Sequence, residues 1–309
     1  MRIINLDLDK TNNVKLPMCA CIGYFDGMHK GHRALIKETI ELSQKYNCPS
    51  ALITFDKDPF EIIQGNHDIK HISTFRQKIN LAVSYGIQNI IILHFTKEMC
   101  ELEPHAFINK VLKQVNLKAL VCGFDFRYGY KGAGDCYSLR NSVDYEVVIM
   151  DAVEDDKGKI SSTRIIEAIK EGNLNDASKM LDYYFTIEGM VISGNHEGTK
   201  MGFPTANIEI SNEYVLPPMG VYAGYAFING QRYKAMINLG HNPTINYSEN
   251  VSLEVHILDY KDDLYGKMVS IEFVEFVRDE MKFKNRDNLI MQLEQDAIIV
   301  NKILNNHGE

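Results

Sequence analysis

The sequence lacks a long apolar run, which argues against a helix that spans a membrane. The longest aliphatic stretch covers residues 90–93, whereas a spanning helix needs about 20 predominantly apolar residues. The first nine residues carry acids where a secretory signal peptide needs a basic start and an unbroken apolar core. We therefore expect a soluble protein whose N-terminus is that of the mature chain.

Cysteine pairs with the spacing of a metal finger or a redox motif are also absent. The six cysteines contain no C-x-x-C pair and all lie in the first half of the chain: Cys19, Cys21, Cys48, Cys100, Cys122 and Cys136. Unpaired spacings of this kind are typical of proteins from reducing compartments. The sequence predicts an intracellular, cytoplasmic protein.

An excess of positive charge is missing as well. The chain has 33 Lys and Arg against 41 Asp and Glu, a formal net charge of -8. Non-specific nucleic-acid binding depends on a surplus of basic residues that neutralise phosphates, and no basic helical extension is visible. We expect no nucleic-acid and no membrane partner, although a small anionic substrate can still bind through local donors and a divalent cation.

With 309 residues, 45% of them hydrophobic, the chain is long enough for two domains. In the first half, helical patterns at 31–46, 74–86 and 104–116 alternate with short apolar runs, which lie at 18–24, 50–55, 89–95, 119–123 and 145–150. This alternation predicts an α/β, Rossmann-like parallel sheet covered by helices. In such sheets ligands bind beyond the C-terminal ends of the strands.

After about residue 185 the hydrophobic period changes to two. Strands are predicted at 184–193, 205–210, 221–229, 232–239, 251–259 and 268–277. Asn229-Gly230 predicts a hairpin turn between two of them, and a helix is expected over 286–304. The second half is therefore predicted to be an antiparallel six-stranded barrel with a terminal helix. The change of period, near 183–187, predicts domains at 1–184 and 185–309.

The segment G-Y-F-D-G-M-H-K-G-H at 23–32 carries the clearest chemistry of the first half. A tight turn follows the first strand, so His29, Gly31 and His32 fall at the start of the first helix, where free N–H groups and the helix dipole favour phosphate. The imidazoles can donate hydrogen bonds to a phosphoryl group and stabilise its charge. Two alternatives remain open: the histidines only cap the helix, or they form a metal pair, for which no third ligand is visible nearby.

Two further segments follow strands in the same half. The first is C-G-F-D-F-R-Y-G-Y at 122–130, which by itself could be an ordinary loop. The second is I-S-S-T-R-I at 160–165, just before a helical pattern at 164–171. Ser and Thr at a helix start are most often plain caps, but with Lys159 and Arg164 beside them they could hold a polyphosphate.

The order strand, D-G turn, H-x-G-H and helix resembles the H-x-G-H nucleotidyltransferases. Nearly the whole chain further resembles the bifunctional bacterial riboflavin kinase/FMN adenylyltransferase family, also called FAD synthetase. Besides the three segments above, the matching motifs are G-F-P-T-A-N at 202–207, P-x-G-V-Y-A at 218–223, N-L-G-x-N-P-T at 238–244, L-E-V-H-I-L-D at 253–259, the string at 278–283 and the last helix.

The resemblance implies that the first half transfers AMP from ATP to FMN and releases pyrophosphate. His29 and His32 would bind the triphosphate and stabilise the transition state, and Asp125 would contact the flavin substrate. The residues implied to bind ATP or its phosphates in this half are Gly23, Phe25, Asp26, Gly31, Ser162, Thr163 and Arg164.

The second half would phosphorylate riboflavin. Thr205 and Asn207 would hold ATP and magnesium, and Glu254 would accept the proton of the ribityl hydroxyl. The resemblance also implies that Gly194 and Gly198 bind ATP and that Asn238 and Arg278 bind the flavin. Magnesium is expected at both sites, and ATP, riboflavin, FMN and FAD are the implied substrates and products.

The residues by themselves are compatible with these roles but do not require them. In an alternating strand Glu254 and His256 lie on the face opposite Leu253 and Val255, although most strand carboxylates are simply solvated. Likewise, P-T-A-N alone is only a turn into a strand. It gains interest because Gly189, Gly194, Gly198 and Gly202 precede it and let the backbone approach phosphates.

The chain departs from the family pattern at a few positions. Lys57 and Asp58 replace Pro and His of a T-F-x-P-H-P segment, Ile166 stands where an Arg is usual after S-S-T, and Thr199 stands where an Arg follows a glycine. Two alternatives to the bifunctional enzyme therefore remain: only one half is active, or the chain is a flavin-binding regulatory protein of the same fold.

Overall fold

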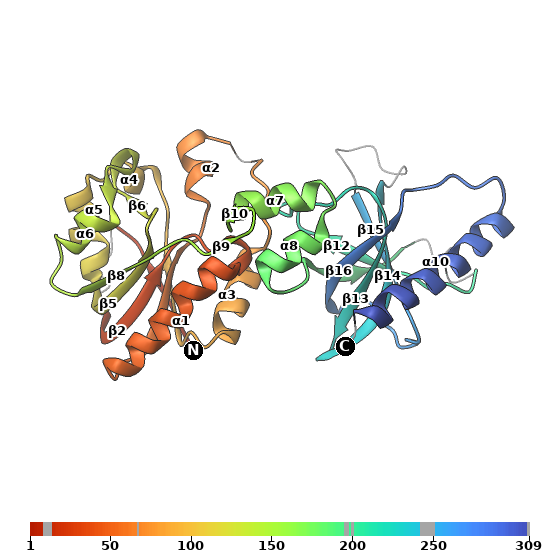
Figure 1. Cartoon of the computed structure of the whole chain (residues 1–309), viewed down its shortest axis with the longest axis horizontal. Helices are drawn as coiled ribbons and strands as arrows, with labels where there is room; N and C mark the ends of the chain where they lie inside the picture. Colours follow the sequence, from red (N-terminus) through yellow and green to blue (C-terminus); the bar gives the residue numbers. More distant parts are fainter. Residues whose placement is uncertain (9–13, 67, 195–197, 199–200, 242–250, 308–309) are drawn as a thin grey trace. The chain divides into compact units, whose positions relative to one another are not determined.

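A computed structural model describes residues 1–8, 14–66, 68–194, 198, 201–241 and 251–307. Thr199 and positions 242–244 of the N-L-G-x-N-P-T motif lie outside them. The chain forms two compact units, one of residues 1–69 and 74–162 and one of residues 70–73 and 163–309 (Figure 1). The helices α7 (Ser162–Lys170) and α8 (Leu174–Leu181) thus group almost entirely with the second unit, and the predicted boundary at 184/185 stays a prediction.

The first unit is a six-stranded parallel sheet of order β1-β4-β3-β2-β5-β8. The bounds are β1 (Arg2–Leu6), β2 (Val14–Ile22), β3 (Ser50–Phe55), β4 (Asn89–Leu93), β5 (Val115–Gly123) and β8 (Glu146–Met150). These confirm the predicted α/β sheet and its five predicted strands. The inner strands β3 and β4 are buried along their whole length, as parallel strands covered on both faces must be.

Helices cover both faces of this sheet. One apolar cluster joins the strands to α1 (Lys30–Lys45) and α3 (Phe75–Ser84), and another joins them to α5 (Pro104–Lys110) and α6 (Cys136–Arg140). The shorter elements are η1 (Asp26–Met28), α2 (Pro59–Gln64), α4 (Lys97–Cys100), η2 (Leu112–Gln114), β6 (Arg127–Tyr128), η3 (Tyr130–Gly132), β7 (Gly134–Asp135), β9 (Glu154–Asp155) and β10 (Gly158–Lys159).

Two details differ from the sequence prediction. The edge strand β1 was not predicted, because Arg2 and Asn5 leave only two consecutive apolar residues between them. The helix expected over 104–116 ends at Lys110, and after one 3-10 turn the chain enters β5 at Val115. Val115 and Leu117 are buried on alternate positions, so the strand period replaces the helical one earlier than the pattern indicated.

The second unit is a closed antiparallel barrel of order β11-β12-β15-β14-β13-β16, as predicted. Its strands are β11 (Thr186–Ile192), β12 (Ala206–Ile210), β13 (Gly220–Ile228), β14 (Gln231–His241), β15 (Val251–Ile257) and β16 (Met268–Arg278). Asn229 and Gly230 join β13 and β14 with φ of 50° and 83°, which confirms the predicted hairpin turn because both central residues need positive φ.

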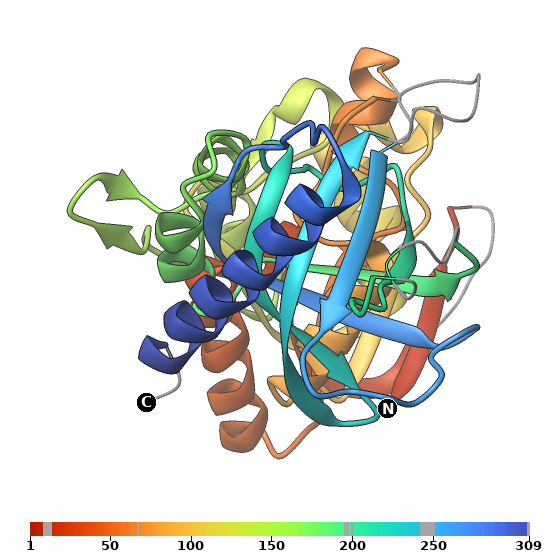
Figure 2. The same cartoon turned by 90° about the vertical axis from the view of Figure 1, so that its right-hand side faces the viewer.

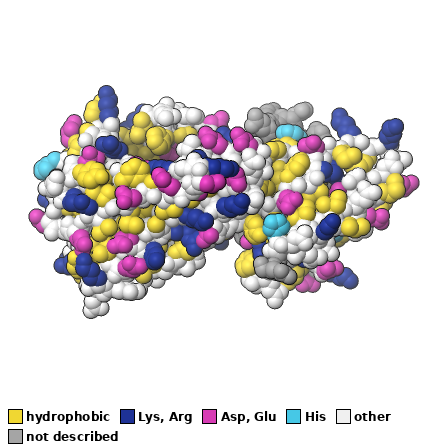
Figure 3. All heavy atoms as spheres, in the orientation of Figure 1, with side chains coloured by type: hydrophobic (Ala, Val, Ile, Leu, Met, Phe, Trp, Pro, Cys, Tyr) yellow, Lys and Arg dark blue, Asp and Glu magenta, His cyan; other side chains and the backbone are white. Residues whose placement is uncertain are grey.

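The terminal helix α10 (Arg286–Asn306) lies across the outside of the barrel (Figure 2). Val300 and Leu304 pack into an apolar cluster with Val221 and Met236 of the barrel wall. On the face drawn in Figure 3, basic and acidic side chains are interspersed on each unit. Among the described residues, no helix combines the length and apolar character that crossing a membrane requires.

Candidate active sites

The G-Y-F-D-G-M-H-K-G-H motif forms a tight turn directly after β2. Phe25 has φ 61° and Gly27 has φ 71°, so the chain turns through a short 3-10 segment before α1 begins. The ring of Phe25 is buried under this turn, and a side chain on Gly23 would start 3.3 Å from that ring. The turn therefore presents the start of α1 beyond the C-terminal end of β2, where a parallel sheet binds ligands.

His29 caps α1 and stacks on His32. Its Nδ1 accepts a hydrogen bond from Gly31 N over 3.1 Å, and the two imidazole rings lie 3.7 Å apart with 23° between their planes. The capping alternative is thus correct for Nδ1, but it leaves Nε2 of His29 for another partner. Nδ1 of His32 is buried and has no hydrogen-bond partner within the described part of the chain.

Both imidazoles are held in the neutral form. Burial lowers the pKa of His29 from 6.5 to about 4, against the opposing effect of Asp26. Burial also lowers the pKa of His32 well below its usual value, and the nearby His29, Lys78 and Lys159 add to the effect. A bound polyphosphate would oppose these shifts, since negative charge favours the protonated imidazole. The pair can therefore strengthen its interaction as phosphate charge arrives.

The two other predicted segments of this half reach the same place. Ser162 Oγ donates a hydrogen bond to Asp26 O over 3.0 Å, which ties the I-S-S-T-R-I segment to the first turn. The Lys159 ammonium pairs with the Asp125 carboxylate and lies 4.8 Å from the ring centroid of Phe124. The three segments thus meet at one edge of the sheet. Thr163 and Arg164 lie in the first turn of α7, and their phosphate contacts stay predictions.

Asp58, which departs from the family pattern, has a local structural role. Its carboxylate accepts a hydrogen bond from Phe60 N over 2.7 Å and caps α2, and the residue is only 7% exposed.

The sequence analysis missed a polar pair at the ends of two adjacent strands. Asp56, directly after β3, contacts Nδ1 of His94, directly after β4. Polar residues directly after two buried parallel strands were the pattern that could have indicated it.

In the barrel, four predicted site residues lie in a single row across five strands. Asn207 of β12 is opposite Glu254 of β15, which is opposite Asn238 of β14. The row continues through Val221 of β13 to Arg278 of β16. Because directly opposite residues of antiparallel strands share a face, the register alone places these four polar side chains on the same side of the barrel wall.

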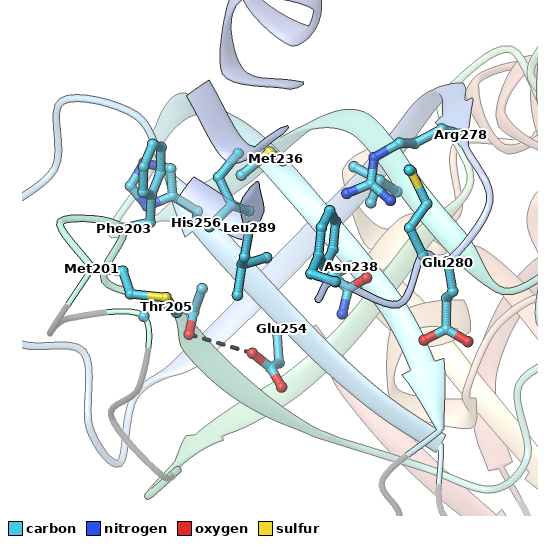
Figure 4. A pocket seen from close by; sticks show the side chains of 15 residues that line it. Met201, Phe203, Thr205, Met236, Asn238, Glu254, His256, Arg278, Glu280 and Leu289 are labelled. Atoms are coloured by element: carbon cyan, nitrogen blue, oxygen red, sulfur yellow. Dashed lines mark hydrogen bonds between the residues drawn. The ribbon is translucent and has the colours of Figure 1, made fainter. Parts of the chain in front are cut away.

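Glu254, Asn238 and Arg278 of this row border a cavity of about 310 Å³ between the wall and the start of α10 (Figure 4). Thr205 Oγ1 donates to Glu254 Oε2 over 3.5 Å at one end of the cavity. Leu253 and Val255 are buried on the other face of β15, which confirms the predicted alternation around Glu254. Apolar side chains from the wall, from α10 and from the segment before α10 also line it, including Met236, Phe283, Leu289 and Leu293.

A second cavity of about 360 Å³ shares Thr205 with the first and is also lined by Asn207 and Gly194. A Cβ on Gly194 would lie 2.0 Å from Asn207 Nδ2, and one on Gly198 would lie 2.3 Å from Phe203 O. Glycine at both positions therefore lets the backbone of residues 194 and 198 lie close to the P-T-A-N segment. Glu254 lines the first cavity, and Thr205, which donates to its carboxylate, lines both cavities.

Comparison with known proteins covers both halves of the chain. A FAD synthetase family model matches residues 12–164, and a riboflavin kinase model matches residues 181–304. Bifunctional riboflavin kinase/FMN adenylyltransferases are similar over most of their length. The Listeria monocytogenes protein is 36% identical, with 89% of this chain and 88% of its own covered, and the Escherichia coli K12 protein is 32% identical, with 90% of each covered.

The chain belongs to the bifunctional riboflavin kinase/FMN adenylyltransferase family. A crystal structure titled as a macrolide-efflux protein from Streptococcus pneumoniae is also similar, with a TM-score of 0.86, 32% identity and coverage of 97% of this chain and 98% of that one. Its title names a different activity. The two family models and the curated relatives agree with each other, and both families are enzymes that act on flavins.

The barrel residues fit the magnesium ion that this family implies. The described residues contain no group of three or more His, Cys, Asp or Glu that could enclose a metal ion. Thr205 and Asn207 instead offer side-chain oxygens where Gly194 and Gly198 keep space open. This donor set suits magnesium, which takes oxygen ligands and is commonly held by substrate phosphates and water with few protein groups.

Arg278 carries a second role that the sequence did not indicate. Its Nε and Nη2 donate to the fully buried Asp296 carboxylate over 2.7–3.0 Å, and Nη1 donates to Asp279 O over 2.8 Å. Gln292 also donates to Asp296 over 2.9 Å. The guanidinium thus fastens α10 to β16 at the edge of the first cavity, and its predicted contact with flavin stays a prediction.

Proposed function

We propose that this chain phosphorylates riboflavin with ATP to give FMN, and then transfers AMP from a second ATP to FMN to give FAD. The observation that carries the proposal is that one chain holds both sites: Glu254 in a barrel cavity beside Thr205, and the stacked His29 and His32 at a helix start. The bifunctional relatives, similar over about nine-tenths of the chain, support assigning both steps to it.

In the kinase step Glu254 accepts the proton of the primary ribityl hydroxyl. The new O–P bond forms at the γ-phosphorus of ATP while the bond to the β-phosphate oxygen breaks, and ADP leaves. A strand holds the carboxylate in one place, which favours repeated proton transfer in one geometry. Thr205 and Asn207 orient the phosphates, and a magnesium ion held with them would neutralise phosphate charge.

In the adenylyl step a phosphate oxygen of FMN attacks the α-phosphorus of ATP, and pyrophosphate leaves. His29 and His32 donate hydrogen bonds to the phosphates as charge moves onto the leaving group, together with the free N–H groups at the start of α1. Ser162 keeps the first turn in place through Asp26 O. Asp125, two residues after the end of β5, is proposed to contact the flavin substrate.

One assay tests the proposal. Purified protein is incubated with riboflavin, ATP and Mg²⁺, and riboflavin, FMN and FAD are separated by chromatography. We expect FMN and then FAD. If FMN forms but FAD does not, even when FMN is supplied, the chain is a riboflavin kinase only. If FAD forms from supplied FMN but riboflavin is not converted, the chain is an FMN adenylyltransferase only. No turnover of either flavin would contradict both activities and favour a flavin-binding regulatory protein.

We also propose a cellular location and partners for the enzyme. All six cysteines are free thiols, and Cys19 and Cys48 remain unbonded with their Sγ atoms 3.5 Å apart. Two thiols at such a short distance stay reduced most readily in a reducing compartment, which supports a cytoplasmic location. The proposed partners are the small molecules riboflavin, FMN, ATP and Mg²⁺, without a nucleic acid or a membrane surface.

A further inference from the structure

The backbone pairing of the P-T-A-N segment with β15 does not extend to Thr205, the residue that is proposed to bind the nucleotide. The ladder between β12 and β15 ends at the pair Ala206 and Val255. One more antiparallel pair would place Thr205 opposite His256, but that pair is not formed. Something other than the ladder must therefore hold Thr205.

The side chain of His256 takes over at this position. Its Nδ1 lies 2.8 Å from the carbonyl oxygen of Pro204. A carbonyl can only accept, so Nδ1 carries the hydrogen and donates it. The peptide between Pro204 and Thr205 is planar and trans, so fixing the Pro204 carbonyl also fixes the backbone N–H of Thr205.

Neighbouring contacts keep the imidazole in this orientation. Its ring meets the Phe203 ring edge to face at 5.2 Å between centroids, and Figure 4 shows the two side chains together at the cavity. Phe203 N in turn donates to Gly198 O over 2.9 Å. The segment before Thr205 is thus held by backbone on one side and by His256 on the other.

We propose that His256 is a positioning residue of the kinase site, which holds the Pro204 carbonyl so that Thr205 faces Glu254 and the nucleotide. It acts through the P-T-A-N segment, and no proton transfer is assigned to it. This inference rests on the kinase activity proposed above.

Two substitutions separate this role from a simple loss of packing. In His256→Asn the amide nitrogen occupies nearly the position of imidazole Nδ1 and can still donate to Pro204 O. In His256→Gln the amide nitrogen falls nearer the position of Nε2 and cannot. We expect the ATP KM of riboflavin phosphorylation to rise about five- to tenfold in His256→Ala and His256→Gln, the effect of one lost hydrogen bond. The Asn variant should stay within about twofold of the wild type.

Two further readouts exclude a general structural effect. The KM for riboflavin should change less than that for ATP, and FAD formation from supplied FMN should be unchanged in all three variants. In ¹⁵N-histidine-labelled protein without ligands, the neutral His256 ring should show the Nδ1-protonated tautomer, with its resonances identified by their loss in the Asn variant.

The outcomes are distinguishable. Equal ATP KM values in the Ala and wild-type proteins, equal defects in the Asn and Gln variants, or an Nε2-protonated ring would each overturn the role of His256. A wild-type protein that forms no FMN from riboflavin would instead overturn the kinase activity on which the inference rests.

Discussion

Glu254 is the residue on which the kinase step depends most directly. Replacing it with Gln keeps the shape and removes the proton acceptor, so we expect kcat for riboflavin phosphorylation to fall about 10²- to 10⁴-fold. FAD formation from supplied FMN should be unchanged. Glu209→Gln, on the neighbouring strand β12 and exposed, is the matched control and should retain full activity. A Glu254→Gln enzyme with wild-type kcat would remove the carboxylate from the mechanism.

His29 is expected to make the fold sensitive to acid. Its pKa is lowered from 6.5 to about 4 by burial, so below pH 6.5 the unfolded chain takes up a proton that the folded chain does not. Stability is therefore lost as the pH falls from 6.5 towards 4, by about 2 kcal/mol at pH 5 for this group. His29→Asn keeps a capping oxygen for Gly31 N and removes the titration.

Urea denaturation at pH 7 and pH 5 measures this effect. The loss of unfolding free energy between the two pH values should be smaller in His29→Asn than in the wild type, and unchanged in the control His105→Asn, whose ring is exposed. His29→Ala should also lose the cap, about 1 kcal/mol at both pH values. An equal pH dependence in the wild type and His29→Asn would show that this imidazole is not kept neutral by burial.

At the scale of elements, we expect the contact between β16 and α10 to be the one most sensitive to substitution. Asp296 is fully buried and binds Arg278 in a bidentate pair. Asp296→Leu leaves the guanidinium without its partner and should lower the free energy of unfolding of the barrel by about 3 kcal/mol, measured in urea. Because α10 carries Leu289 and Leu293 into the first cavity, the KM for riboflavin should rise as well.

A double variant separates the structural role of Arg278 from its predicted flavin contact. Arg278→Met combined with Asp296→Leu replaces the pair with apolar groups of similar size and should recover much of the lost unfolding free energy. If Arg278 also binds flavin, the KM for riboflavin should remain raised after stability has recovered. Full recovery of that KM would confine Arg278 to holding α10.

Elements with strong periodicity were predictable, and contacts between them were not. The buried strands β3 and β4 are unbroken apolar runs, and Asn229-Gly230 fixed a hairpin by backbone geometry alone. The alternation in β15 correctly placed Glu254 on the face away from the buried Val255. The edge strand β1 has only one protected side, and the Arg278 and Asp296 pair joins residues whose meeting depends on packing that no local pattern records.

At the scale of the whole molecule, the two proposed reactions depend on different catalytic residues, Glu254 for the first and His29 and His32 for the second. A His29→Ala chain should make FMN but no FAD, and a Glu254→Gln chain should make FAD only from supplied FMN. Mixed in equal amounts with riboflavin, ATP and Mg²⁺, the two variants should form FAD after a lag, because FMN released by the first reaches the second. Chromatography of samples taken over time measures the lag. No FAD from the mixture, while each variant performs its own step, would show that FMN does not pass through solution.

The polar row across the barrel has a consequence for how this protein tolerates insertions and deletions. Asn207, Glu254, Asn238 and Arg278 share a face only because their strands are in register. A single residue inserted in β14 before Asn238 would turn every later side chain of that strand to the opposite face and separate Asn238 from its neighbours. An added residue at the Asn229-Gly230 turn would lengthen only the hairpin loop. Length variation that spares catalysis should therefore occur at the turns of the barrel and be excluded from its strands.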